Sequence, residues 1–384
     1  YEGVQIEFGF ELFKADRTLS STYGPFSGAT RSKSEFVPIP AMAFSAQIND
    51  KLTVGLGGLG IGGFGVDYPS ALDNPILAPR PNGFGQVYSN LSMLKFTPAL
   101  AYKVADNVSI GFAGNVSWAS LAIDPMPAAS PAVSPGADGT PGTMDDQAFY
   151  SRATAQDGAF GFGFQVGVLW DINEVLSLGV AYNSPQWFQS FEFNSMYENP
   201  DLPNFGFPRE IDFRLDVPAF FGAGVAINAS PDTVIGVDWK YMMYESTKGF
   251  ELDDPSMPFD ATGAVKGFGW KNINVFAVGM QQWVSERMKV RAGYNYSDNP
   301  VPDDLSFFNI AAPAIVQHHL TLGMGLQVAP QMELDFGYYH VFDNEISCPM
   351  WNMMGPIQGT SVGSSMQEDS FQMMFVFTPG AGGN

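Results

Sequence analysis

The residues that could carry out chemistry are few, and their spacing does not suit it. His318 and His319 are adjacent, so on a strand their side chains point to opposite faces and cannot bind one metal ion. The third histidine, His340, could approach His318 only through strand pairing, and the single cysteine, Cys348, cannot form an internal disulfide. No nucleophile elbow, phosphate loop or Ser/His/Asp arrangement appears. We therefore expect neither an enzyme nor a resident cofactor or metal.

Methionine and aromatic side chains are more numerous, and many stand in Pro- and Gly-rich segments that are typical of loops. Soft, aromatic linings suit apolar ligands that offer few polar anchors. Each buried methylene contributes about 0.8 kcal/mol, so a long apolar chain can be held without a charged clamp. The candidate ligand-contacting residues are Met126, Phe149, Met196, Tyr197, Phe205, Phe207, Met350, Trp351, Met353 and Met354.

The elements that must position these residues show a two-residue alternation, seen best between Tyr88 and Trp118. After the turn at 104–107, one face of the chain is apolar and the other is small or polar. The apolar face holds Val108, Ile110, Phe112, Val116 and Trp118. Successive side chains of a strand point to opposite sides, so both runs that flank the turn are predicted to be strands. They are longer than the usual soluble strand of about 5–6 residues.

The composition indicates where such strands lie. Hydrophobic residues make up 45% of the 384-residue chain and charged residues only 15%, below the usual level of roughly a quarter. The sequence contains no apolar run of about 18 residues that could form a transmembrane helix. A chain this apolar must therefore keep its hydrophobic side chains away from water by alternating apolar and polar residues along strands, so that one face of each strand is apolar. An aromatic content of 14% fits a lipid-facing band with aromatic girdles, so the fold class is predicted to be all-β, a closed transmembrane β-barrel.

The alternation and the turns predict about fourteen strands. Tight turns and long loops alternate along the chain, which places every long loop at one end. This arrangement and the even strand number are typical of the outer membrane of Gram-negative bacteria. We expect one barrel over residues 1–378 and a short tail at 379–384. The predicted strands are 3–16, 38–48, 52–68, 88–103, 108–118, 158–172, 176–193, 210–229, 233–251, 270–284, 289–297, 314–328, 332–345 and 370–378.

Charge gives two further expectations. The net charge of −21 argues against nucleic acid as a partner, because phosphate binding needs a basic patch. Acidic pairs in the loops are either solvated or bridge through divalent cations to outer-membrane lipid and lipopolysaccharide. They are Asp138, Asp145, Asp146, Asp253, Asp254, Asp303 and Asp304. On the predicted strand 332–345, Glu333 and Asp335 face the lumen, as a binding site or, in the reading we favour, an inward polar network.

The predicted third strand, 52–68, is unusually rich in glycine. Glycine weakens a strand interior and often marks a bulge or a bend. The run is either a barrel corner or a deliberate break in the wall. Since an apolar solute gains most by leaving sideways into the bilayer, we predict a kink with irregular pairing near residues 60–65. The glycines that would form this lateral gate are Gly60, Gly62, Gly63 and Gly65.

The run from Arg291 to Asp303, R-A-G-Y-N-Y-S-D-N-P-V-P-D, resembles a motif of the FadL/TodX outer-membrane transporter family. The segments Phe308–Gly323 and Gly269–Asn272 are similar to others of that family. The resemblance implies uptake of long-chain fatty acids and hydrocarbons, and a third strand that bends inward. It also implies that Lys271 matches one of two basic residues offered to a carboxylate; from the residues alone, Lys271 is equally an ordinary strand-end lysine at the membrane interface. The second has no equivalent in 115–123, which favours a hydrocarbon-like molecule.

The family pattern also begins with an N-terminal hatch, whereas this chain starts at the first barrel strand. We therefore expect an outer-membrane channel for passive uptake of hydrophobic compounds, with lateral release into the membrane. The alternative is a scaffold barrel that anchors other envelope proteins. A stoichiometric partner after mild detergent purification would favour the scaffold, and a co-purified lipid would favour transport. A general porin, which would conduct hydrophilic solutes, ranks below both.

Overall fold

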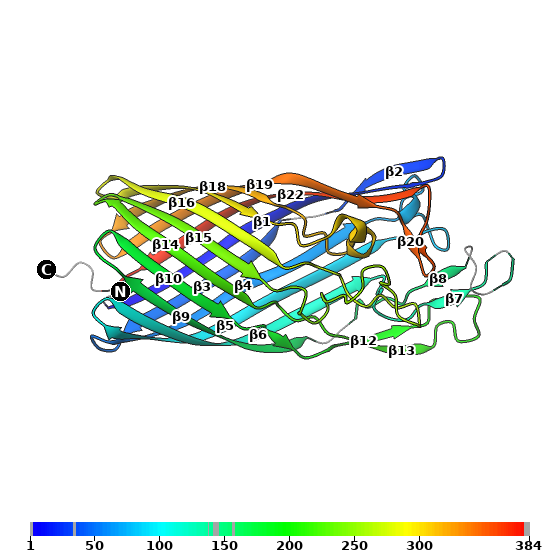
Figure 1. Ribbon diagram of the computed structural model, residues 1–384, viewed down its shortest axis with the longest axis horizontal. Helices are drawn as coiled ribbons and strands as arrows, with labels where there is room; N and C mark the ends of the chain where they lie inside the picture. Colours follow the sequence, from blue (N-terminus) through cyan, green and yellow to red (C-terminus); the bar gives the residue numbers. More distant parts are fainter. Residues whose placement is uncertain (1–2, 34–35, 137, 141–145, 156–157, 380–384) are drawn as a thin grey trace.

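The computed structural model describes residues 3–33, 36–136, 138–140, 146–155 and 158–379. Its wall strands pair with their neighbours around a ring, and β9 pairs with β10 to close it (Figure 1). The predicted all-β class and fourteen-strand antiparallel barrel are confirmed. The wall strands are β1 (Val4–Tyr23), β3 (Val37–Gln47), β4 (Leu52–Tyr68), β5 (Val87–Ala105), β6 (Val108–Asp124), β9 (Ala159–Asp171), β10 (Leu176–Asn183), β14 (Phe220–Ser230), β15 (Thr233–Met242), β16 (Ile273–Ser285), β17 (Met288–Ser297), β18 (His318–Ala329), β19 (Met332–Cys348) and β22 (Thr360–Phe377).

Shorter elements belong to the long loops at one end of the barrel. They are β2 (Phe26–Arg31), η1 (Pro75–Leu77), β7 (Ala132–Ser134), β8 (Gln147–Phe149), β11 (Trp187–Phe188), β12 (Phe191–Met196), β13 (Pro208–Phe213), η2 (Asp303–Asn309), β20 (Trp351–Asn352) and β21 (Gly355–Pro356). The termini and the tight turns lie at the opposite end (Figure 1). Asparagine side chains hold two of these turns. Asn49 accepts hydrogen bonds from the backbone N–H groups of Lys51 and Leu52, and Asn173 does the same two and three residues ahead.

Three predicted strands are too long. In the segment 176–193 the regular wall strand ends at Asn183, just before Pro185, and only Trp187 and Phe188 pair with β9 again; 210–229 is divided by Pro218 into β13 and β14. Proline removes a backbone donor and ends regular pairing in both places. The segment 233–251 leaves the wall at Met242, because Tyr244 and Phe250 pack together inside the barrel mouth. The buried apolar residues of the parts that lie beyond the wall strands, such as Phe191, Phe193 and Phe250, therefore serve loop packing and not the membrane face.

Three predicted strands are clearly too short: 108–118 continues in β6 to Asp124, and 3–16 and 370–378 are extended in β1 and β22. β1 and β22 pair without interruption from Ile6–Phe377 to Tyr23–Thr360, although the prediction ended at 16 and began at 370. The added part of β22, residues 360–369, holds three serines and one glycine and lies mostly within the predicted loop 346–367. It pairs because its inward side chains, such as Val362 and Ser364, are buried against the loops inside the barrel. The proposed tail at 379–384 lies, apart from residue 379, outside the described residues.

The outer face of the wall changes character along the strands. On β1, Phe8 is 54% exposed, and the outward positions near the turn end of neighbouring strands are also apolar. Further along, charged and polar side chains take over the same face. This polar belt consists of Lys14, Asp16, His318, His340 and Asp369. The outer face thus changes from apolar side chains nearer the tight turns to titratable side chains nearer the long loops. This change marks the edge of the hydrocarbon region on the loop side.

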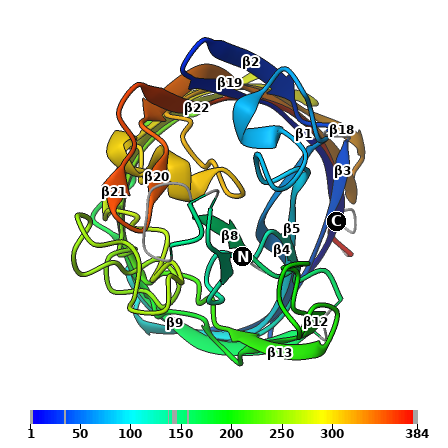
Figure 2. The same ribbon diagram turned by 90° about the vertical axis from the view of Figure 1, so that its right-hand side faces the viewer.

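The loop end of the barrel is filled. Buried side chains from the upper parts of β5 and β6 pack with residues of the loops 125–158, 184–219, 243–272 and 298–317 into one hydrophobic core. Viewed from this end, β8 and other loop segments lie inside the ring of strands (Figure 2). We call this core the loop plug. Among the described residues, no helix is long and apolar enough to cross a membrane.

Candidate functional site

The wall has a break on one edge of β4. β3 pairs with β4 from Gln47–Thr53 to Ala41–Leu59, and no further pairs join these strands among the described residues. On its other edge β4 stays paired with β5 up to Tyr68–Val87, apart from a register shift between Gly60 and Gly62. We call residues 60–66 of β4, which have no ladder partner on β3, the wall break. The irregularity lies in the glycine-rich stretch, but it affects one edge only.

Two prolines explain why the β3–β4 ladder stops. The N–H of Gln47 donates to Gly3 on the β1 side, and the N–H of Ile48 donates to Leu52 on the β4 side. Backbone donors alternate between the two edges of a strand, so even-numbered residues of β3 present their nitrogen to β4. Pro38 and Pro40 have no N–H to present. β3 therefore has no donor for β4 beyond Ala41, while its pairing with β1 continues to Val37–Phe13.

Glycine lets β4 pass close to its neighbours at this point. A Cβ atom at Gly60 would collide with the side chain of Ile39, and one at Gly63 would collide with the carbonyl oxygen of Leu91. At the loop end β4 and β5 lie inward of β3 (Figure 2). The upper end of β4 is tied back to the wall, since the N–H of Lys33 donates to the carbonyl oxygen of Asp67 at 2.9 Å. The wall break is therefore limited on both sides: the β3–β4 ladder precedes it, and the hydrogen bond between Lys33 and Asp67 follows it.

The inward stretch of β4 rests on the loop plug. The ring of Phe64 meets that of Phe268 edge-on, with 6.4 Å between centroids. Phe268 belongs to an aromatic cluster with Tyr244, Phe250 and Trp270, whose closest ring pair, Phe250–Trp270, is 4.6 Å apart. Burial there raises the pKa of Tyr244 to about 12.

Asn309 of η2 locks this aromatic cluster. It accepts a hydrogen bond from Trp270 Nε1 at 2.6 Å and donates to the carbonyl oxygen of Phe268 at 3.0 Å. The side chain of Asn309 therefore holds both Phe268 and Trp270 in place. Asn309 therefore sets the position of the rings on which Phe64 rests.

The break opens at the height of the apolar band. By register, the last β3–β4 pair aligns with Gly9 on β1, between the outward-facing Phe8 and Phe10. The polar belt begins only at Lys14, further along the same strand. The start of the break therefore faces hydrocarbon and not the aqueous exterior.

On the inner side the break adjoins the lumen. A cavity of about 940 Å³ is bounded by Ile39, Pro40, Leu59 and Gly60 at the break and by strands β15 to β19 across the barrel. Several polar side chains on this side of the lumen pair with one another, whereas Asn295 Oδ1 and His319 Nδ1 in the cavity lining have no hydrogen-bond partner among the described residues. Arg291 pairs with Asp335 at 2.6 Å, Lys289 pairs with Glu333, and Tyr339 donates to Glu11 at 2.8 Å. Glu333 and Asp335 thus belong to an inward polar network, as favoured above.

The chain matches known proteins over most of its length. A family model described as outer membrane protein transport protein (OMPP1/FadL/TodX) matches residues 2–368. The chain belongs to this family. It is 22% identical over 342 residues to outer membrane protein P1 of Haemophilus influenzae, covering 84% of this chain and 71% of that protein. Family membership and the barrel place it in the outer membrane of a Gram-negative bacterium.

Solved structures share the fold of this FadL/TodX family member. A FadL homologue of Pseudomonas aeruginosa aligns with a TM-score of 0.72 at 17% identity, covering 98% of this chain and 90% of that one. The toluene transporter TodX of P. putida aligns with a TM-score of 0.70 at 15% identity and the same coverage. At such identities the likeness concerns the fold alone. The predicted family resemblance is confirmed.

The predicted ligand-contacting residues of this transporter lie in separate environments. Phe149 is 7% exposed within the packed loops, and Trp351 is partly buried, 5.5 Å from the ring of Phe308. Met196, Phe205 and Phe207 are exposed on or near the β12–β13 hairpin at the loop end. Of the remaining loop residues, Met126 and Met350 are buried, while Met353 and Met354 are exposed. The buried ones serve loop packing, so sequence reasoning could not separate them from exposed ones.

The structure also places the charged and titratable residues that the sequence analysis singled out. Lys271 is exposed, and its side chain has no hydrogen bond or ion pair to any residue that the structure describes. His340 pairs with Asp369 and His318 contacts Tyr294, both on the outer face. In the described part of the chain, no three His, Cys, Asp or Glu residues are grouped to hold a metal ion. Of the acidic loop pairs, Asp145 lies outside the described residues.

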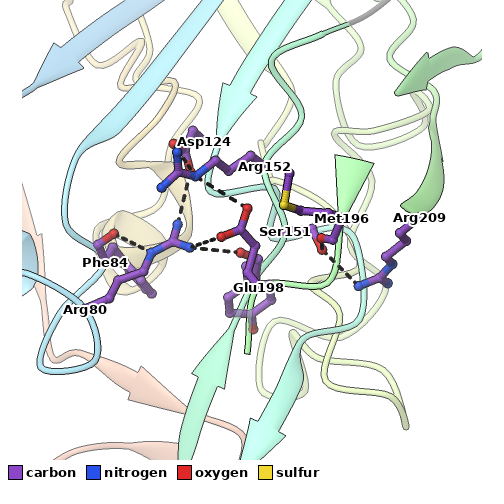
Figure 3. Close-up of polar contacts among 9 residues, drawn as sticks. Arg80, Phe84, Asp124, Ser151, Arg152, Met196, Glu198 and Arg209 are labelled. Carbon is purple, nitrogen blue, oxygen red and sulfur yellow. Dashed lines mark hydrogen bonds and ion pairs between the residues drawn. The ribbon is translucent and has the colours of Figure 1, made fainter. Parts of the chain in front are cut away.

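Four charged residues tie the loops together above the plug. Arg80 donates to Asp124 at 3.1 Å and to the carbonyl oxygens of Phe84 and Tyr150, and it lies 3.7 Å from Glu198 (Figure 3). Arg152 contacts the same two carboxylates at 3.6 Å, but its side chain is 57% exposed against 21% for Arg80. Arg80 is therefore the junction of three loops, and Arg152 adds a solvated outer contact.

This difference predicts unequal effects of the two arginines. Replacing Arg80 by alanine leaves the buried Asp124, which is only 8% exposed, without its main partner, at a cost of about 1–3 kcal/mol. We expect hydrogen–deuterium exchange of segments 69–86 and 146–155 to speed up by about tenfold or more. Arg152→Ala is the matched control and should change exchange little, because exposed ion pairs contribute about 0–1 kcal/mol. Equal exchange in the two variants would contradict the assigned role of Arg80.

Proposed function

We propose that this family member is a passive channel that takes up hydrophobic compounds and releases them sideways, through the wall break, into the membrane. The observation that carries the proposal is the unpaired edge of β4, which starts within the apolar band and adjoins the lumenal cavity. Relatives with this fold are named as a toluene transporter and as monoaromatic hydrocarbon channels. These names support a small apolar substrate.

The route begins at the exposed loop residues. Met196, Phe205 and Phe207 offer an apolar surface outside the membrane, with exposed fractions of 46%, 51% and 61%. A solute captured there passes the loop plug into the lumen. The lumen is lined in part by the polar network around Arg291, so an apolar solute gains little by staying. Entry into hydrocarbon through the break returns about 0.8 kcal/mol for each methylene buried.

The first test of this function is uptake by cells. Bacteria that carry the gene should accumulate a radiolabelled alkane or toluene faster than bacteria without it, because the polysaccharide layer slows free entry of apolar solutes. Conductance of hydrophilic solutes in planar bilayers serves as the control for a wide aqueous pore and should be small. Equal uptake by bacteria with and without the gene would contradict the proposed function.

A disulfide across the break tests lateral release. The Cβ position of Gly60 lies 3.8 Å from the Cβ atom of Ile39, the usual spacing of a disulfide. In a Cys348→Ala background, Ile39→Cys with Gly60→Cys should lower uptake when oxidised, because the bond pins β3 to β4 where their ladder ends. Reduction should restore uptake.

The matched control staples a part of the wall that is already paired. Ala43 and Gly57 are direct cross-strand partners, so Ala43→Cys with Gly57→Cys should form a disulfide without changing uptake. Heat-modifiable migration on gels would verify that both barrels fold. Unchanged uptake by the oxidised Ile39–Gly60 staple would show that solute leaves elsewhere.

A further inference from the structure

Two neighbouring polar atoms on the inner wall lack a hydrogen-bond partner. Asn295 of β17 and His319 of β18 are direct cross-strand partners. Their strand neighbours Tyr294 and Leu320 are exposed on the outer face, so both side chains point to the lumen. Among the residues that the structure describes, nothing pairs with the buried Asn295 Oδ1 or His319 Nδ1. Direct cross-strand partners have their Cβ atoms about 4.5–5.5 Å apart, so one small group can contact both side chains.

The two side chains belong to the wall of the large lumenal cavity. Asn295 and His319 both line the space of about 940 Å³, which reaches Pro40 and Gly60 at the wall break. A polar atom that is buried without a partner costs free energy, and such atoms are rare in folded proteins. The terminal torsions of Asn and His are broad, so each side chain can turn toward a group in the cavity at little cost. The pair is therefore available to a ligand in this space.

Other polar groups of the same lining are already engaged. Arg291 donates hydrogen bonds to Gln281 at 2.9 Å and to Asp335 at 2.6 Å. Tyr339 donates to Glu11 at 2.8 Å. These groups satisfy one another and offer little to a ligand. The cross-strand pair on β17 and β18 is therefore the part of this lining best placed to recognise a polar group.

The charges of the lining disfavour an anion. The charged side chains of the cavity wall are the carboxylates of Glu11, Asp238 and Asp335 and the guanidinium of Arg291. Arg291 is already bound to Asp335, so an entering carboxylate meets no free cation among the described residues of this lining. It meets further negative charge instead, and like charges repel more strongly inside a protein than in water. The ligand group that fits this cavity is therefore neutral.

A hydroxyl group matches the cross-strand pair. Asn295 Oδ1 only accepts hydrogen bonds, so it needs a donor. His319 Nδ1 accepts in one tautomer of the neutral imidazole and donates in the other. A hydroxyl offers one donor and two acceptor lone pairs, so it serves both tautomers. An ether or a carboxylate cannot donate to Asn295, and a hydrocarbon leaves both atoms unpaired.

We propose that Asn295 and His319 form a lumenal subsite for the hydroxyl group of a neutral amphipathic ligand, an alcohol or a phenol with an apolar body. This inference rests on the proposed function and names a substrate class for it. The apolar body lies in the cavity toward Ile39 and Leu59 at the wall break, while the hydroxyl is held across the barrel. Hydrocarbons take the same route without using either polar atom.

The test compares two isomers, decan-1-ol and nonyl methyl ether, of which only the alcohol donates a hydrogen bond. Each is radiolabelled and dialysed to equilibrium against the purified barrel in a non-ionic detergent, with detergent alone as the blank. The measurement is made at about pH 8, where an imidazole with an ordinary pKa is neutral. The wild-type protein should bind the alcohol about fivefold more tightly than the ether, the value of one neutral hydrogen bond. Unlabelled decanoate should displace labelled decan-1-ol far less effectively than unlabelled decan-1-ol does.

Variants of the pair should remove this preference. Asn295→Leu and His319→Phe should each abolish most of it and leave the affinity for the ether unchanged. Asn295→Asp keeps an acceptor of the same shape and should retain the preference. Gln372→Leu is the matched control, because this amide lines the same cavity but already donates to Glu11 at 3.1 Å. It should leave both affinities unchanged, and heat-modifiable migration should verify folding of every variant.

The outcomes separate the subsite from the channel. Equal affinities of the wild-type protein for the two isomers would overturn the subsite, while binding of the ether still upholds the channel. A preference that persists in both Asn295→Leu and His319→Phe, or that falls equally in Gln372→Leu, would overturn it as well. Displacement by decanoate as strong as displacement by decan-1-ol would overturn the assignment to a neutral ligand. Failure of the wild-type protein to bind either isomer would contradict both proposals.

Discussion

The structure depends on the rule that no backbone hydrogen-bonding group can go unpaired in lipid. Fourteen strands satisfy it by closing into a ring, so that every strand has two neighbours. The rule also limits where the ring can be interrupted. Pro38 and Pro40 remove the two donors that β3 would offer to β4, and β4 turns inward at the same height. The interruption occurs where β3 has no backbone N–H to donate and where β4 has turned inward, away from the hydrocarbon.

Much of this fold could be predicted from the chain itself, because the wall imposes a period of two on every strand. The strand 52–68 was predicted with its observed bounds, and both ends of the tight turns were found within a few residues. The period fails at the loop end, where Phe250 and Trp270 are buried in the plug. Apolar residues that face a protein core look the same as those that face lipid. The strands 176–193, 210–229 and 233–251 were extended too far for this reason.

The candidate site was less accessible to sequence reasoning. The glycines pointed to the right stretch of β4, but the signal that explains the break is the Pro-x-Pro at 38–40, which stood inside a predicted strand. An alternating proline pair on one edge is a pattern that could have been used. Phe149 and Trp351 were selected by residue type, which does not reveal burial.

The loop plug and the wall break are coupled by direct contacts between their residues. β4 is held inward by its ladder to β5, which continues past the register shift between Gly60 and Gly62, and by the contact of Phe64 with Phe268. Phe268 is positioned by Asn309, which belongs to a different loop and also bonds Trp270. Aromatic packing of this kind adds about 0.5–1.5 kcal/mol for each ring pair and helps to offset the ladder bonds that β4 does not make to β3. If the proposed function holds, a loop rearrangement that admits a solute past the plug would act on the same residues that hold the break in shape.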